Sequence, residues 1–292
     1  WLDSLGQPWT LVGEAVAIWM VAGVLAIITY AIRYGKYALT DRGQLLYVQN
    51  GILRRKHQAL DKARLRGVEI RLPVYLRLLG GGRLEPIMTG TKKGAAASTL
   101  LPQAPIKDVR RVAIRILGDP TPVTVPLRRH PWKAARRRIT RGLMPFWIVA
   151  GLIVLVRIDS GPSAEIWVRW AIPAALVFFL ALSVDRIRML GHALLPDMLV
   201  TSHGSWTAKR TVLEADGIIG WTVTQSVFQR SAGVATVSAA TPAGNGVYSV
   251  MDMDADEAWA LAEALTPGIT DVWNHEGDPD MRSSPSMGIR AQ

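Results

Sequence analysis

The chain contains an internal duplication, and this repeat constrains its architecture more than any other feature of the sequence. The stretch LYVQNGILRRKHQAL, from Leu46, resembles LVTSHGSWTAKRTVL, from Leu199. Aligning Gly51 with Gly204 relates them by an ungapped offset of 153 residues. Further pairs at this offset are Leu60 with Leu213, Gly67 with Gly220, Arg77 with Arg230 and Gly80 with Gly233. Internal repeats mark repeated structural units, so both copies are expected to share one fold.

The likeness extends upstream with one small gap, and it includes the apolar segment before each copy. LDSLGQPW, from Leu2, resembles IDSGPSAEIW, from Ile158, and YALTD, from Tyr37, resembles HALLPD, from His192. The repeating unit is therefore an outer loop, a membrane helix and a soluble domain. Since another apolar segment precedes the second copy, symmetry predicts a further membrane helix before Trp1.

Three apolar segments are candidates for membrane helices, which need about 20 mostly apolar residues to cross the bilayer. They run over Leu11–Ile32, Leu143–Val156 and Ile166–Val184. We assign residues 9–33 to one transmembrane helix and residues 142–184 to a transmembrane helical hairpin.

Lys and Arg gather at one end of each apolar segment. Arg33 and Lys36 follow the first, RRHPWKAARRRITR (128–141) precedes the second, and DRIR (185–188) follows the third. The loop IDSGPSAE between the last two has neither Lys nor Arg. Because cytoplasmic flanks carry the excess of these residues, both soluble domains are expected in the cytoplasm, on a multi-pass anchor in the inner (plasma) membrane.

Each soluble copy is predicted to be β-rich. Asn50-Gly51 and His203-Gly204 suit the positive φ of tight hairpin turns, and VEIRLPVYLRL (68–78) and WTVTQSVFQ (221–229) alternate as strands do. Amphipathic helices are predicted over IKDVRRVAIRIL, from Ile106, and DADEAWALAEAL, with Asp254 as N-cap. The predicted fold class is α-helical membrane segments plus two small β-barrel or sandwich domains, each closed by a C-terminal α-helix. The domains occupy residues 34–118 and 185–268, with a basic juxtamembrane linker at 119–141 and a disordered tail at 269–292.

The order of these features resembles the bacterial pleckstrin-homology-like (PH-like) domains of YdbT-like membrane proteins. A strand, a glycine, a basic strand, Leu-Asp or Leu-Glu, and Arg-x-x-Gly follow a predicted membrane helix in both copies, and paired helices in the second. The resemblance implies tandem PH-like domains on membrane hairpins, without an established enzyme activity. The second copy departs from the pattern, because TAKR (207–210) is less basic than RRKH (54–57). An anion-binding role is therefore expected mainly of the first copy.

No catalytic constellation stands out, and we expect a protein that is not an enzyme. The chain has no cysteine, and no two of its five histidines stand four residues apart. The carboxylates of MDMDADE (251–257) do not follow the calcium-binding loop of an EF-hand and are better explained as an acidic helix start. We therefore expect no metal and no cofactor.

Basic runs are the one sign of a binding site. The candidate residues for a lipid headgroup or another anion are Arg54, Arg55, Lys56, Arg128, Arg129, Lys133, Arg136, Arg137, Arg138 and Arg141. Cations held near an anionic leaflet favour binding to it, and the second run is expected either to press the first domain against the membrane or to capture a lipid headgroup. The alternative is that these charges only set topology. Nucleic acid is not expected as a partner, because no basic face is interleaved with aromatic residues.

Two functional hypotheses follow. In the first, the protein is a non-enzymatic membrane scaffold whose cytoplasmic domains bind other membrane proteins, each other or anionic phospholipid of the bilayer. The resemblance adds an involvement in envelope stress or in resistance to membrane-active peptides. In the second, the chain is a component of a lipid or small-solute transport assembly, which would need polar residues facing one another at mid-bilayer.

Overall fold

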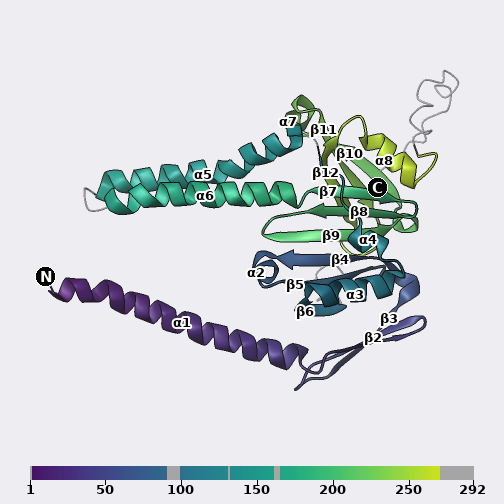
Figure 1. The fold of residues 1–292 in the computed structure, drawn as a ribbon, viewed down its shortest axis with the longest axis horizontal. Coiled ribbons are helices and arrows are strands. Elements are labelled where there is room, and N and C mark those ends of the chain that lie inside the picture. The colour runs from purple at the N-terminus through teal and green to yellow at the C-terminus, as the bar shows by residue number, and fades with distance from the viewer. Residues whose placement is uncertain (1, 91–98, 131, 161–164, 270–292) are drawn as a thin grey trace, which may run out of the picture.

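A computed structural model of the chain describes residues 2–90, 99–130, 132–160 and 165–269. Apart from Ile269, the tail predicted at 269–292 lies outside the described residues. In Figure 1 a soluble β-rich body carries long helical arms, which are α1 (Leu2–Tyr34), α5 (Trp132–Ser160) and α6 (Glu165–Arg188).

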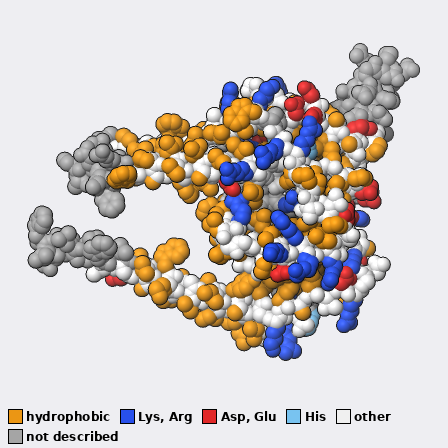
Figure 2. All heavy atoms as spheres, in the orientation of Figure 1, with side chains coloured by type: hydrophobic (Ala, Val, Ile, Leu, Met, Phe, Trp, Pro, Cys, Tyr) orange, Lys and Arg blue, Asp and Glu red, His pale blue; other side chains and the backbone are white. Residues whose placement is uncertain are grey.

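The three arms are long and apolar enough to cross a membrane, over Gly13–Tyr34, Trp132–Leu155 and Trp170–Arg188. Protein covers only 0%, 11% and 6% of these windows, so their apolar side chains need another apolar environment. Figure 2 shows hydrophobic side chains along α1 and along the α5–α6 hairpin, whereas charged side chains gather on the body. All arms leave the body on one side (Figure 1), so both soluble modules lie at the same end of the three helices.

Two parts of the linker predicted at residues 119–141 are helical. Its first part forms the short helix α4 (Thr121–Thr124), whose Val123 is 3% exposed and belongs to the core of the first module. Its basic end forms the first turns of α5, because Ala134, Ala135 and the arginines are good helix formers. The hairpin therefore begins as a helix well before residue 142.

α5 and α6 approach each other closely at Gly142. A Cβ added to Gly142 would lie 2.2 Å from the Ser183 hydroxyl oxygen, so only glycine fits there without rearrangement. The Ser183 hydroxyl donates to the Phe179 carbonyl at 2.8 Å within its own helix. Small residues at such a contact let helix backbones come together, which is typical of packing between membrane helices.

The first soluble module follows α1. Its elements are β1 (Ala38–Arg42), β2 (Leu45–Asn50), β3 (Lys56–Asp61), η1 (Lys62–Arg64), β4 (Leu65–Pro73), α2 (Val74–Leu78), β5 (Gly81–Met88), β6 (Leu101–Pro105) and α3 (Ile106–Leu117). The second module follows α6. Its elements are β7 (Gly191–Leu195), β8 (Met198–His203), β9 (Thr207–Glu214), η3 (Ala215–Gly217), β10 (Gly220–Thr224), α7 (Val227–Ser231), β11 (Val234–Ala240), β12 (Val247–Asp254) and α8 (Ala258–Leu265).

The duplication is visible element by element. β1, β2, η1 and α2 recur as β7, β8, η3 and α7 with the offset of 153 residues unchanged. The gap predicted upstream of Leu46 is wrong within this hairpin, because Arg42 pairs with Leu45 and Leu195 pairs with Met198 in equivalent registers. Both hairpins have loops of the same length, so the first strands align without an insertion.

The strands form three sheets, in the orders β1-β2-β3, β10-β11-β12 and β6-β5-β4-β9-β8-β7. The last sheet belongs to both modules, because β4 pairs with β9 from Gly67↔Leu213 to Pro73↔Thr207. Two separate domains are predicted from the sequence, whereas the modules share this six-stranded sheet.

The shared sheet carries a hydrophobic core on each face, because successive side chains of a strand point to opposite faces. Val200 and Val212 lie in the core formed with β1–β3 and α3. Leu199 and Leu213 lie in the core formed with β10–β12 and α8. These four side chains are 0% exposed, and burying each stabilises the fold by about 1.5–3 kcal/mol.

A buried carboxylate lies on the seam between the modules. Glu69 of β4 is 3% exposed, and Arg71 of the same strand donates to it. Lys209 of β9 lies 3.8 Å from the same carboxylate, and the Thr211 hydroxyl donates to it at 3.4 Å. Because a buried charge needs partners, this cluster adds a polar link between the modules to the ladder of backbone hydrogen bonds.

Candidate anion-binding site

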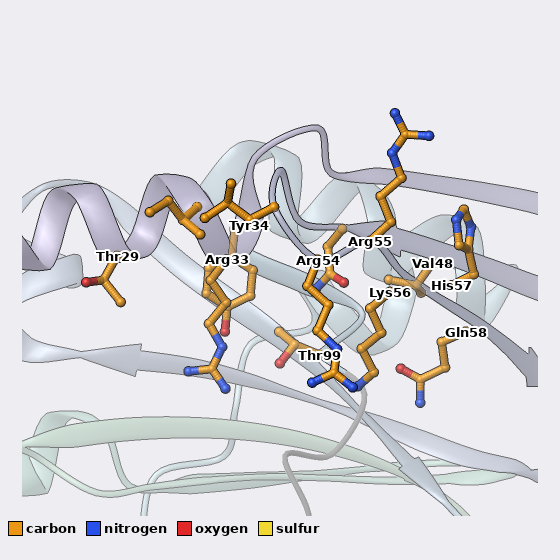
Figure 3. A pocket seen from close by; sticks show the side chains of 13 residues that line it. Thr29, Arg33, Tyr34, Val48, Arg54, Arg55, Lys56, His57, Gln58 and Thr99 are labelled. Carbon is orange, nitrogen blue, oxygen red and sulfur yellow. The ribbon is translucent and has the colours of Figure 1, made fainter.

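A hollow of about 750 Å³ lies where α1 meets the β2–β3 hairpin. Arg33, in the last turn of α1, lies on one side of the hollow, and Arg54 and Lys56 of the hairpin lie on the other (Figure 3). Ile32 of α1 and Leu53 of the hairpin loop also line it. The candidate membrane span of α1 ends at Tyr34. The hollow therefore lies at the end of this apolar segment.

Gly51 fixes the turn against the helix. Its φ is +99°, and an added Cβ would lie 2.1 Å from the Arg54 carbonyl oxygen. The Gly51 N–H donates to the Gly35 carbonyl at 2.9 Å, and the Ile52 N–H donates to the Ile32 carbonyl at 3.0 Å. These bonds join the turn to the end of α1 and place the basic run beside Arg33. Gly204 holds the same place in the second module, with φ +104°.

Three cations point into the same space. In Figure 3 Arg33, Arg54 and Lys56 extend to one side of the hairpin, whereas Arg55 extends to the opposite side. Within the described residues no carboxylate forms an ion pair with any of the four, and all four are exposed. Such a group of converging cations attracts an anion.

An exposed apolar side chain stands next to these cations. Leu53 is 79% exposed and lines the hollow, and its neighbour Ile52 is 50% exposed. Apolar and basic side chains side by side at the end of a membrane helix match the boundary between acyl chains and anionic headgroups. The hollow therefore suits an amphiphilic anion better than a fully hydrated one.

The second basic run lies elsewhere. Asp252 of β12 accepts from Arg137, from Arg138 Nε at 2.8 Å and from Gln229 Nε2 at 3.0 Å. Asp252 and Arg138 are 4% and 8% exposed, so this is a buried ion pair. The central arginines of this run, Arg137 and Arg138, therefore bind a carboxylate of the second module. The expected contact of the run with the membrane or a headgroup stays a prediction.

The remaining cations of that run are spread over separate cavities. Arg128 pairs with Glu257 at 2.6 Å and lines a cavity of about 190 Å³ together with Arg129. Lys133 and Arg136 line another of about 390 Å³. Arg141 lines a third of about 510 Å³. The ten predicted residues are thus not brought together into one site.

The two modules carry corresponding cavities. Arg186, which lines the 510 Å³ cavity with His203 and Gly204, is the counterpart of Arg33 at the offset of 153 residues. Gly81 and Val234 are equivalent at the offset of 153 residues, and they pair with Pro105 and Asp254. Two residues before these partners, Gln103 of the first module corresponds to Asp252 of the second. The second cavity is therefore neutralised by its own carboxylate, and the first is not. Arg33 was not among the predicted site residues. The arginine at the equivalent position of the second copy, Arg186, is the sequence signal that could have indicated it.

Two histidines far apart in sequence form a pair. His192 Nδ1 lies 3.1 Å from His130 Nε2, and His130 Nδ1 lies 2.9 Å from the Asp252 carbonyl oxygen. Because a carbonyl only accepts, His130 donates through Nδ1 and accepts from His192 through Nε2. Burial, together with the neighbouring His130 and Arg128, lowers the pKa of His192 to about 4. Burial also lowers the pKa of His130. Both rings are therefore neutral at pH 7.

The comparison with known families agrees with the duplication. The family model of the bacterial PH domain matches the chain twice, over residues 7–119 and 144–268. The matched stretches cover more than half of the chain. The first includes most of α1 and the first module, and the second includes most of α5, all of α6 and the second module. Neither the curated proteins nor the solved structures contain a match.

Proposed function

Because the chain belongs to the bacterial PH domain family and carries that domain twice, we propose that it is a non-enzymatic membrane scaffold whose first module binds an anionic phospholipid headgroup. The closer likeness to YdbT-like proteins stays a prediction. The proposed ligand site is the hollow between α1 and the β2–β3 hairpin, with Arg33, Arg54 and Lys56 as its cations.

One observation carries this proposal. Three exposed cations converge beside the exposed Leu53 at the end of a candidate membrane span, without a described carboxylate to neutralise them. Each Lys or Arg near an anionic leaflet contributes about 1 kcal/mol of attraction. The corresponding cavity of the second module contains Asp252, so we assign headgroup binding to the first module alone.

We further propose that both modules face the cytoplasm from the inner membrane. The ends of the three arms near the body carry Arg33, the run from Arg128 to Arg141, and Arg186 and Arg188. This excess of positive charge favours the cytoplasmic side. The exposed Phe228 of the second module and the exposed Trp132 of α5 line one cavity, and this surface is then available to other membrane proteins or to a second copy.

The test uses the purified full chain in detergent micelles, titrated with dihexanoyl phosphatidylglycerol and, in parallel, with dihexanoyl phosphatidylcholine. Native mass spectrometry counts the bound lipid. Losing both Arg54 and Lys56 (Arg54→Ala with Lys56→Ala) should weaken phosphatidylglycerol binding roughly tenfold to thirtyfold. The matched control is Lys107→Ala with Arg115→Ala, which removes the same two residue types from the exposed side of α3 and should leave binding unchanged.

Three outcomes would contradict the proposal. One is equal phosphatidylglycerol binding by the hollow variant and the control. Another is equal binding of phosphatidylcholine, since the cations would then contribute nothing. The third is competition by inorganic phosphate at the affinity of the lipid, since Leu53 would then add nothing to recognition.

A further inference from the structure

The short helix α2 of the first module carries an unusually exposed apolar tip. Leu78 and Leu79 are each 82% exposed, and Tyr75 is 54% exposed. For comparison, Trp19 on the membrane-spanning part of α1 is 79% exposed. The chain turns sharply after the two leucines at Gly80, whose φ is +71° and whose N–H donates to the Arg77 carbonyl at 3.1 Å. The leucines therefore stand at the apex of a tight turn.

An ion pair holds α2 to the last turn of α6. Arg77 Nη2 donates to Asp185 Oδ2 at 2.8 Å, and the two side chains are 25% and 23% exposed. Asp185 lies within the span Trp170–Arg188, close to the point where α6 enters the second module. Leu78 directly follows Arg77 in the chain, so the ion pair between Arg77 and Asp185 holds the apolar tip beside the end of α6.

A chain of hydrogen bonds holds α2 to the last turns of α1. Gln103 Nε2 donates to the Tyr75 hydroxyl at 3.1 Å, and the Tyr30 hydroxyl donates to the Gln103 carbonyl at 3.0 Å. Tyr30 lies one turn before the end of the span Gly13–Tyr34. The helix α2 is thus fixed between two membrane arms, at the level where both leave the apolar segment.

The α5–α6 hairpin reaches the end of its apolar segment at the same depth as α2. Gly142 meets Ser183 directly before the apolar run of α5 begins at Leu143, and Asp185 follows Ser183 by two residues. In Figure 1 α2 lies on the side of the body from which the arms project, between α1 and α6. Figure 2 shows hydrophobic side chains at this margin of the body.

We propose that the Leu78–Leu79 tip enters the lipid of the membrane interface between α1 and the α5–α6 hairpin. The occupant is the bilayer itself, because both tethers of α2 end on membrane-spanning helices at the depth of their last turns. An apolar surface at this depth is buried about 5–10 Å into the boundary between headgroups and acyl chains. This contact is apolar and goes beyond the headgroup site, which depends on cations.

The experiment uses the full chain, which has no native cysteine, in phosphatidylcholine nanodiscs. Single substitutions Leu79→Cys, Ile18→Cys and Lys107→Cys are labelled with a small environment-sensitive fluorophore. Ile18 on α1 is 69% exposed within a span and reports lipid, whereas Lys107 is exposed on α3 and reports water. Quenching by lipids with a nitroxide high on the acyl chain is compared with quenching by aqueous iodide.

We expect the label at Leu79→Cys to be quenched by the nitroxide lipid at least about twofold more than at Lys107→Cys, and to be shielded from iodide. Iodide quenching equal to that at Lys107→Cys would overturn the proposal, since the tip would be in water. Shielding from both quenchers would also overturn it, because a protein segment or a second copy would then cover the tip. Zwitterionic lipid separates this result from the headgroup site, which needs an anion.

Discussion

Replacing Asp252 by asparagine tests how firmly the membrane hairpin is fixed to the second module. Asp252 accepts hydrogen bonds from Arg137 and Arg138 of α5 and from Gln229 of α7. Its φ is +57°, a conformation that asparagine adopts about as readily as aspartate. The substitution Asp252→Asn therefore removes the charge and leaves the backbone and the side-chain size unchanged.

The magnitude follows from burial. The side chains of Arg138 and Asp252 are 9% and 6% exposed, so the guanidinium has little water to replace its partner. Breaking a buried pair from one side costs about 3–5 kcal/mol, and the remaining amide oxygen recovers part of that, which leaves about 2–4 kcal/mol. At about 2–4 °C per kcal/mol, the midpoint of thermal unfolding should fall by roughly 5–15 °C.

The assay is thermal unfolding of the full chain in micelles, followed by near-ultraviolet circular dichroism. The control is Asp41→Asn, which breaks the more exposed pair between Lys62 and Asp41 and should cost at most about 1 kcal/mol. Adding Arg138→Met to Asp252→Asn should restore part of the lost midpoint, because it removes the unpaired charge. Equal midpoints for Asp252→Asn and the control, or a further loss on adding Arg138→Met, would refute this account.

Acidification should destabilise the fold through the histidine pair. The folded pKa of His192 is about 4 and its unfolded value is near 6.5, so as the pH falls from about 6.5 to about 4 the unfolded chain gains a proton that the folded chain does not. The free energy of unfolding should drop by about 3 kcal/mol across this window, and His192→Gln should flatten the dependence in denaturant titrations; an unchanged slope in the variant would contradict it. In the β2–β3 turn, Gly51→Ala should cost more than Gly43→Ala in thermal unfolding, by about 1–3 kcal/mol. Both glycines have positive φ, but only at Gly51 would the Cβ meet a carbonyl, so equal losses would disprove the role of that contact.

Features that depend on neighbouring residues could be predicted from the sequence. The positive φ of Gly51 and Gly204 is confirmed. The loops that these glycines begin are longer than tight two-residue turns, because Asn50 pairs with Lys56 and His203 pairs with Lys209. The repeat also predicted which elements would recur, since β2 and β8 occupy equivalent positions at the aligned offset. The same repeat identifies the family, whose domain matches both copies.

Features that depend on distant partners could not be predicted. The carboxylates of MDMDADE were interpreted as a helix start with Asp254 as N-cap, whereas β12 continues through Asp254 and the N-cap of α8 is Glu257. Asp252 instead meets arginines more than a hundred residues earlier in the chain. Hydrophobic periodicity indicates which side chains are buried, but it does not show which buried charges meet.

The shared sheet was missed for the same reason. Two domains were predicted because a membrane hairpin separates the copies, and a local pattern does not reveal that β4 pairs with β9 across it. Of the cations that line the candidate hollow, Arg54, Arg55 and Lys56 belong to the basic run predicted as a site. Arg33 is distant from that run in sequence, and the fold brings it there by placing the end of α1 beside the turn.

Because β4 pairs with β9, the shared sheet cannot be completed until β9 has been synthesised. Thr211, opposite Glu69 in the seam, lies 142 residues later in the chain, and ribosomes add about 5–20 residues per second, so β4 waits on the order of 10–30 s for its neighbour. During that interval α5 and α6, two of the candidate membrane helices, are synthesised, while the edge of β4 is open to other nascent chains. Synthesis of the α5–α6 hairpin therefore precedes completion of the sheet, and a delay at that point would prolong the aggregation-prone stage.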